Sequence, residues 1–274
     1  MSTCLDILRT GTKTQGMSPV HRNTSEISSL GRATVLLREF LRPVPYMTVE
    51  HLVRSTDLPK TTVHRMVDEM LRLGWLSRGE CGLQLGTVFF ELGQMVPAER
   101  TLREAAKPSM QDLQQATQQN VGLAVLDGAE VVYLEALPGR DAPRLPQRVG
   151  GRWPAHASCS GKAMLAFAAE PVLQAVQQAG LRQLTPKTIT SMEGLLAELA
   201  KIRLRGLAFD RQESFETVNG IAAPLRNSAG QVIAALAISG RAGRINLERC
   251  EAALAACASS ISRTIAAAVP GKFV

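Results

Sequence analysis

The fold is decided by one segment, LPKTTVHRMVDEM at residues 58–70. Val63, Met66, Val67 and Met70 recur there at the i, i+3, i+4, i+7 spacing of one helix face. The polar residues of the same helix fall on the opposite face: Thr61, His64, Arg65, Asp68 and Arg72. Pro59 suits a first helical turn, where its missing N–H costs nothing, and Gly74 is a typical C-terminal stop. The segment therefore predicts a short amphipathic helix with one buried side.

Two helices precede this segment and a hairpin follows it. The apolar spacing of residues 27–41 predicts the first helix, and Thr48 can cap the second. After Gly74, residues 75–78 and 83–85 read as short strands around a turn at residues 79–82. Three short helices and a hairpin within about 60 residues are typical of a winged helix-turn-helix, whose third helix reads DNA.

The start of the third helix carries groups that suit DNA. Lys60, Thr61 and Thr62 lie beside unpaired backbone N–H groups, which can meet a phosphate, while Thr61 and Arg65 can reach base edges. The alternative is an ordinary surface helix whose polar face is solvated. Periodicity alone does not separate the two interpretations.

Bulk charge gives little help with this choice. The 274 residues carry a net charge of +7, but residues 1–95 hold 11 basic and 9 acidic side chains, a net of +2. Residues 155–274 hold 13 and 8, a net of +5. Aromatic residues make up 4%, which argues against binding single strands by base stacking. Any DNA binding must therefore depend on where the charges point.

Several classes of protein are disfavoured. The five cysteines and four histidines are scattered without metal-ligand spacing, so we expect no metal and no cofactor. No apolar run approaches the roughly 18 residues that a membrane helix needs, and the first 25 residues lack a signal-peptide layout. We expect a cytoplasmic protein with reduced thiols and no membrane partner.

The second half of the chain predicts an α+β domain. Helices are expected at residues 87–96, around Leu102 to Leu113 with an interruption at Pro108, and then at 160–168, 171–179, 192–205 and 247–268. Strands are expected at residues 121–126, 130–137, 207–210, 221–225 and 231–239. Residues 138–154 read as a long loop. Short turns between the strands favour a mostly antiparallel sheet with flanking helices.

Several blocks of the sequence together resemble one family. They are LPKTTVHR at residues 58–65, VLDGAEVVYL at 125–134, RVGGRWPAHA at 148–157 and GKA at 161–163. In this order and spacing they resemble the IclR-type bacterial transcriptional regulators, over roughly residues 27–268.

The resemblance implies a DNA-binding regulator controlled by a small organic-acid effector. It implies a disordered tail at residues 1–26, a winged helix-turn-helix at 27–86, a linker helix at 87–104 and a GAF-like effector-binding domain at 105–274. The expected partners are double-stranded operator DNA, the effector and further copies of the chain, as a homodimer or a dimer of dimers.

The resemblance also implies site residues. The expected DNA contacts are Thr48, Ser55, Lys60, Thr61, Thr62, His64, Arg65 and Arg78. The expected effector contacts are Ser158, Cys159, Ser160, Gly161, Asp210, Gly220, Ile221, Ala237 and Ser239. Many members have Cys at the position of Gly220 and Ser at that of Ala237. These differences remove polar contacts and leave space, which predicts a different or bulkier effector than the smallest keto-acids.

A second hypothesis is an enzyme that processes a small acid. Cys159, His156 and Asp210 are the residues that favour it, yet no base for Cys159 can be assigned and no G-x-S-x-G pattern is present. We therefore expect no catalytic residues. A third hypothesis, a pure dimerisation or scaffold protein that binds no small molecule, also stays open at this point.

Overall fold

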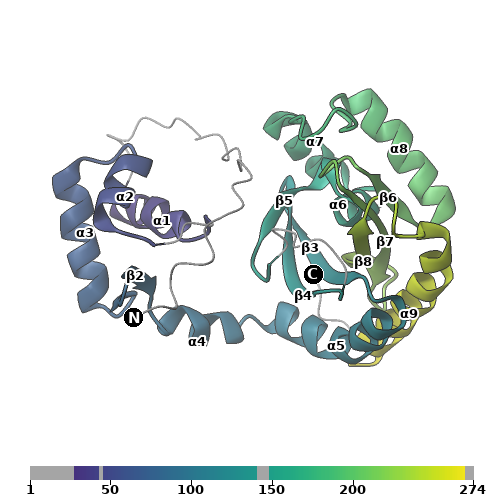
Figure 1. Ribbon diagram of the computed structural model, residues 1–274, viewed down its shortest axis with the longest axis horizontal. Helices are drawn as coiled ribbons and strands as arrows, with labels where there is room; N and C mark the ends of the chain where they lie inside the picture. The colour runs from purple at the N-terminus through teal and green to yellow at the C-terminus, as the bar shows by residue number, and fades with distance from the viewer. Residues whose placement is uncertain (1–27, 43–45, 141–147, 269–274) are drawn as a thin grey trace. The chain divides into compact units, whose positions relative to one another are not determined.

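The computed structural model describes residues 28–42, 46–140 and 148–268 (Figure 1). The chain divides into two compact units, one ending at Phe90 and the other beginning at Glu91. Each unit has a hydrophobic core of its own. No helix in the described ranges has the length and apolar character needed to cross a membrane.

The first unit is a winged helix-turn-helix. Its elements are α1 (Ser29–Glu39), α2 (Val49–Ser55), α3 (Lys60–Arg72), β1 (Leu76–Gly79) and β2 (Gly82–Leu85), followed by α4 (Val88–Gln94) across the boundary between the units. Val63, Val67 and Met70 of α3 are buried, as their spacing predicts, and Met66 packs against the same core. The strands pair antiparallel, with Leu76 opposite Leu85.

Local chemistry sets the ends of these helices. The Thr48 hydroxyl accepts a hydrogen bond from the backbone N–H of His51 at 3.1 Å, so Thr48 caps α2 as predicted. Gly74 follows α3 with a φ of +72°, a left-handed conformation that glycine adopts without strain. Pro59 occupies the cap position of α3 and not its first turn, a shift of one residue from the prediction.

The second unit is built on a six-stranded sheet whose pairings are all antiparallel. The order across the sheet is β5-β4-β3-β8-β7-β6. The strands are β3 (Asn120–Asp127), β4 (Glu130–Leu137), β5 (Arg152–Pro154), β6 (Ala208–Arg211), β7 (Val218–Arg226) and β8 (Val232–Arg241). A turn that contains Gly128, at a φ of +60°, joins β3 to β4, which pair as a hairpin.

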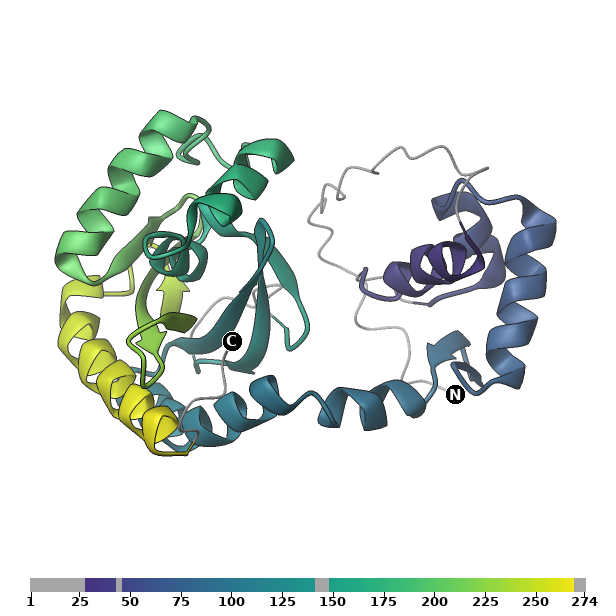
Figure 2. The ribbon, with the colours of Figure 1, turned by 180° about the vertical axis from the view of Figure 1, so that it is seen from behind.

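Helices cover both faces of this sheet, as Figures 1 and 2 show. On one face, α5 (Pro97–Thr117) and α9 (Leu247–Ala268) share a core with Leu123, Ile221 and Leu236. On the other face lie α6 (Cys159–Leu165), α7 (Glu170–Ala179) and α8 (Met192–Arg205). The predicted α+β fold with a mostly antiparallel sheet is confirmed.

Two details differ from the prediction. The expected interruption at Pro108 is wrong, because α5 continues through that residue. Proline removes one helical hydrogen bond there, and the burial of Ala106, Met110 and Leu113 holds the helix on its sheet. The stretch predicted as a loop at residues 138–154 contains β5, whose Trp153 pairs with Val131.

Candidate nucleic-acid interface and effector site

The first turns of α3 present an exposed polar surface. The side chains of Lys60, Thr61, His64 and Arg65 are exposed, and Thr62 is half-buried. Within the described ranges, none of the three basic side chains forms an ion pair. Farther along the helix, Arg72 contacts the Glu69 carboxylate at 2.5 Å. The positive charge that remains available is therefore at the start of the helix.

The other predicted DNA contacts lie on α2 and the wing. Thr48 caps α2, which commits its hydroxyl oxygen, and Arg78 is exposed on β1. Ser55, at the end of α2, has a buried hydroxyl without a hydrogen-bond partner among the described residues. Glu50 lies near Lys60 and His64, and hydrogen bonds from its own backbone N–H and from Thr48, together with these charges, lower the pKa of Glu50.

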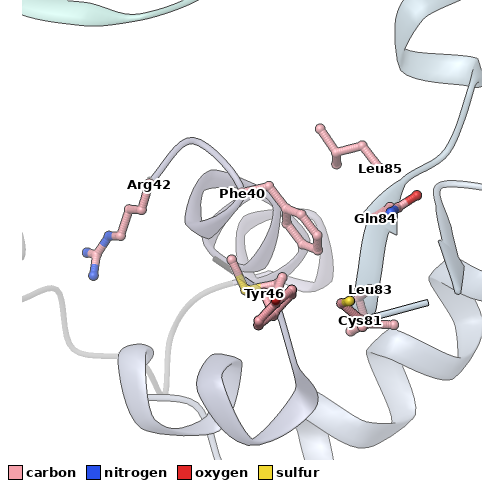
Figure 3. Close-up of a pocket in the computed structure, with 9 residues that line it drawn as sticks. Phe40, Arg42, Tyr46, Cys81, Leu83, Gln84 and Leu85 are labelled. Atoms are coloured by element: carbon pink, nitrogen blue, oxygen red, sulfur yellow. The ribbon is translucent and has the colours of Figure 1, made fainter. Parts of the chain in front are cut away.

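An opening of about 310 Å³ lies at the base of the wing (Figure 3). Phe40 and Tyr46 face Cys81 and the following strand β2 across it, while Arg42 points away. It belongs to the first unit and shares no residue with the predicted effector contacts.

The predicted effector residues gather on the face of the sheet that α6 covers. Asp210 on β6 pairs with Gly220 on β7, and Gly220 pairs with Ser239 on β8. These residues form one row across three adjacent strands. Ala237 lies in the next row, opposite Ala222. Small side chains in this floor let α6 approach the sheet closely.

Ile221 is the exception among the predicted contacts. Its side chain lies in the core with α5 and α9, because neighbouring residues of a strand point to opposite faces. Only the backbone of Ile221 is shared with the row under α6.

The start of α6 forms the roof of this region. The Ser158 hydroxyl caps the helix by accepting a hydrogen bond from Gly161 N–H at 3.0 Å. A Cβ at Gly161 would overlap the backbone of Ala155, so glycine is required by close approach. The Cys159 sulfur lies 3.0 Å from where a Cβ at Gly220 would be. The extra space predicted beside Gly220 is therefore filled by that thiol, so this part of the prediction is wrong, while the space expected beside Ala237 stays a prediction.

A buried charge cluster lies next to the row. Lys162 on α6 has no exposed side-chain surface, and its Nζ is 2.5 Å from both carboxylate oxygens of Glu213. Asp210 accepts hydrogen bonds from the Glu213 N–H at 2.7 Å and from the Ser214 hydroxyl. Burial raises the pKa of Asp210. One ammonium thus serves two buried carboxyl groups.

Two polar groups at this face are buried without a partner in the described ranges. They are the Ser160 hydroxyl on α6 and the indole N–H of Trp153. The Trp153 ring stacks on Phe215, with centroids 4.6 Å apart. Phe215 follows Ser214, so the aromatic pair adjoins the Asp210 loop. Buried donors are normally hydrogen-bonded, which makes these two candidates for meeting a ligand.

The arrangement does not provide a nucleophile and its base. Burial raises the pKa of Cys159 to about 12, which keeps its thiol protonated. His156 hydrogen-bonds the carbonyl of Arg182 through Nε2 at 3.1 Å, and burial lowers its pKa. Cys159 and His156 therefore carry none of the features of an activated pair.

Sequence reasoning missed several residues of this region: Trp153, Lys162, Glu213, Ser214 and Phe215. The sequence offered one signal, since Lys162 stands in a stretch otherwise made of small and apolar residues. Its partner Glu213 is 51 positions away, too far for any helical or strand pattern to reveal.

The first unit is a winged helix-turn-helix with an exposed polar recognition helix, and the second is a sheet unit with a buried polar site. This combination defines a two-domain DNA-binding transcriptional regulator. The comparison with protein families agrees. Residues 29–80 match the IclR helix-turn-helix domain, and residues 95–263 match the bacterial transcriptional regulator IclR C-terminal domain. The chain belongs to the IclR family of transcriptional regulators.

Individual relatives support the same assignment. The HTH-type transcriptional regulator KipR of Bacillus subtilis is 34% identical over 220 residues, 80% of this chain and 88% of KipR. XynR of Escherichia coli is 31% identical over 223 residues, again 80% and 88% of the two chains. The crystal structure of an IclR homolog from Microbacterium hydrocarbonoxydans, complexed with 4-hydroxybenzoate, is 34% identical with a TM-score of 0.78 and covers 88% of this chain and 100% of its own.

Proposed function

We propose that this regulator reads its operator with the start of α3 and that a small organic acid bound under α6 controls that reading. The operator would be double-stranded DNA bound by a homodimer or a dimer of dimers. Residues 27–86 would form the DNA-binding domain, 87–104 the linker and 105–274 the effector-binding domain. The curated relatives KipR and XynR are named as regulators, which supports regulation over catalysis.

The observation that carries the DNA proposal is the exposed, unpaired positive charge at one helix start. Lys60 suits a phosphate, while Thr61 and Arg65 suit base edges in the major groove. Thr62 and His64 lie beside them, and Thr48, Ser55 and Arg78 would contact the flanking backbone. The competing interpretation, a merely solvated face, predicts that these side chains are dispensable.

Alanine variants separate the roles of these groups. Arg65→Ala should weaken operator binding by about 1–3 kcal/mol more than it weakens binding to random DNA if Arg65 reads a base. Lys60→Ala should reduce the slope of log affinity against log salt by about one unit. Arg72→Ala is the matched control, because Arg72 is on the same helix but paired with Glu69. Equal affinities of all three variants and the wild type would defeat the proposal.

The observation that carries the effector proposal is the buried Ser160 hydroxyl without a partner. It lies on α6, which covers the Asp210–Gly220–Ser239 row, and Ala237 belongs to the same floor. Ser158 shapes the roof as its cap, Gly161 permits its close approach and Cys159 fills the space beside Gly220. The backbone of Ile221 completes the row.

We expect the acid to contain an aromatic ring. The stacked Trp153 and Phe215 offer a flat apolar wall beside polar groups, an arrangement that suits a planar ligand. The Microbacterium relative is known in complex with 4-hydroxybenzoate, an acid of this kind.

Thermal melts test the effector proposal directly. 4-Hydroxybenzoate and benzoate should raise the melting temperature more than pyruvate does, and Ser160→Ala should reduce the shift. Ser259→Ala, an exposed serine on α9, is the control and should keep the shift. A shift that is unchanged in Ser160→Ala would exclude this hydroxyl from the site. Recovery of the acid unchanged after long incubation would separate regulation from the small-acid enzyme hypothesis.

A further inference from the structure

A loop between α7 and α8 packs against the segment that carries Asp210. The loop comprises residues 184–188, and the segment comprises residues 210–216, from the end of β6 into the turn toward β7. The segment supplies Asp210 to the proposed effector site, Glu213 to the buried ion pair and Phe215 to the aromatic stack. The position of this one segment therefore sets three features of the site.

The 210–216 segment contains a strained turn. Gln212 has a φ of +68°, a left-handed conformation that is unfavourable for a residue with a Cβ. Asp210 and Glu213, which flank it, are buried and both interact with Lys162, yet their carboxyl groups repel each other. Because strain and repulsion both favour opening of the turn, contacts from outside the segment must hold it closed.

The buried Thr188 hydroxyl makes one of these contacts. It donates a hydrogen bond to the Glu213 carbonyl at 2.6 Å. It also accepts hydrogen bonds from the backbone N–H groups of Leu184 at 3.1 Å and Thr185 at 2.9 Å. A hydroxyl has one hydrogen to donate and two lone pairs to accept with, so these three bonds use its full capacity. Thr188 thus ties the 184–188 loop to the strained turn in a way that a side chain without a hydroxyl cannot reproduce.

Thr185 and Lys187 hold the residue at the centre of the turn. The Thr185 hydroxyl donates to the Gln212 carbonyl at 2.6 Å and accepts from the backbone N–H of Lys187 at 3.1 Å. The Lys187 ammonium donates to the side-chain oxygen of Gln212, whose amide nitrogen donates to the Glu216 carbonyl at 2.6 Å. The loop therefore contacts two successive residues of the turn, although none of its own residues is among the predicted effector contacts.

We propose that Thr185 and Thr188 are positioning residues of the effector site. Their hydroxyl groups hold the strained turn at Gln212 and thereby fix Asp210 and Phe215 for the bound acid. This inference rests on the proposed effector site and extends it to residues that do not touch the ligand. A merely structural role would change the stability of the unit, whereas a positioning role also changes the affinity of the folded protein for the acid.

Titration calorimetry with 4-hydroxybenzoate measures this affinity in the full-length protein, at a temperature where circular dichroism shows every variant folded. Thr188→Val keeps the shape of the side chain and removes the hydroxyl, and it should raise the dissociation constant at least about fivefold. Thr188→Ser keeps the hydroxyl and should bind within about twofold of the wild type. Thr190→Val, at an exposed threonine two positions later, is the matched control and should not change binding. Equal affinity of Thr188→Val and the wild type, or weak binding by Thr188→Ser, would overturn the proposal.

A second substitution tests whether the strained turn is what the hydroxyl holds. Glycine adopts the left-handed conformation without strain, so Gln212→Gly added to Thr188→Val should recover part of the lost affinity. Gln212→Ala removes the same side-chain amide but keeps the strain, and added to Thr188→Val it should recover none. Equal affinities of the two double variants would refute the role of the turn.

The fluorescence of Trp153 supplies a readout that needs no ligand. In a Trp75→Phe background Trp153 is the remaining tryptophan, and its ring stacks on Phe215 of the 210–216 segment. Thr188→Val should shift its emission to longer wavelength, because the stack loosens, and Thr190→Val should leave it unchanged. Unchanged emission in Thr188→Val would overturn the positioning role, whatever the wild type binds. A wild type that binds none of the tested acids would instead refute the proposed effector site.

Discussion

The buried ion pair between Lys162 and Glu213 allows a sharp test of how the effector unit is held together. Glu213→Gln removes the negative charge and keeps the size of the side chain. The Lys162 ammonium has no exposed surface and would then face an amide in place of both carboxylate oxygens. A buried charge that loses its partner cannot recover its hydration, so the loss appears in the folding equilibrium.

The expected magnitude follows from the surroundings of the pair. Removing one partner of a buried ion pair typically costs about 3–5 kcal/mol. Asp210, the second carboxyl of the cluster, also interacts with Lys162 and offsets part of the loss. We therefore expect Glu213→Gln to lower the free energy of unfolding by about 3 kcal/mol, the lower end of that range.

Urea denaturation followed by circular dichroism measures this value. Lys162→Met alone should also destabilise, whereas Lys162→Met with Glu213→Gln should cost clearly less than the two single changes added together, because no unpaired ammonium remains. Additive costs, or a loss below about 1 kcal/mol in Glu213→Gln, would refute the claim that the two side chains stabilise each other in the folded unit.

Three further changes probe the same region. Gly161→Ala should lower the free energy of unfolding by about 2 kcal/mol, because the new Cβ overlaps the Ala155 backbone. The control is Gly93→Ala at the end of α4, where the space is open, and it should be neutral or stabilising in the same thermal melts. Gly220→Ala should lower the free energy of unfolding by about 1 kcal/mol, because the new Cβ meets the Cys159 sulfur. Adding Cys159→Ala should restore most of that stability, and a double variant as unstable as the single one would contradict the role of this contact. Burial lowers the pKa of His156, so as pH falls below 6.5 the unfolded chain takes up a proton before the folded one does and the free energy of unfolding decreases. The stability advantage of the wild type over His156→Gln should therefore shrink between pH 7.5 and 5.5, and a constant difference in urea titrations would contradict it.

The local sequence pattern was sufficient to predict features that depend on a single helix or strand. The spacing of Val63, Val67 and Met70 fixes the buried face of α3, and the same spacing leaves Lys60 and Arg65 outside. Neither result needs knowledge of the partner helices, because a 3.6-residue period defines the face by itself.

The local sequence pattern did not predict features that depend on packing between two segments far apart in the sequence. Most of β7 is buried on both faces, so its sequence shows no alternation from which the direction of Ile221 could be read. The space beside Gly220 depends on Cys159, which comes 61 positions earlier and from a different element. Such contacts are set by packing between layers, and a single sequence does not contain them in local form.

The same distinction explains why net charge was a poor guide to DNA binding. The first 95 residues have a net charge of only +2, and this sum does not say where the uncancelled charges lie, because an acid and a base that pair contribute zero to it. In the described part of the first unit, Glu39 pairs with Arg42 at 3.3 Å and Glu69 pairs with Arg72. At the start of α3, Lys60, His64 and Arg65 are exposed and outnumber the carboxylate of Glu50, which lies near Lys60 and His64. A phosphate responds mainly to charges within about one Debye length, roughly 8–10 Å, so this local excess and not the total determines the attraction.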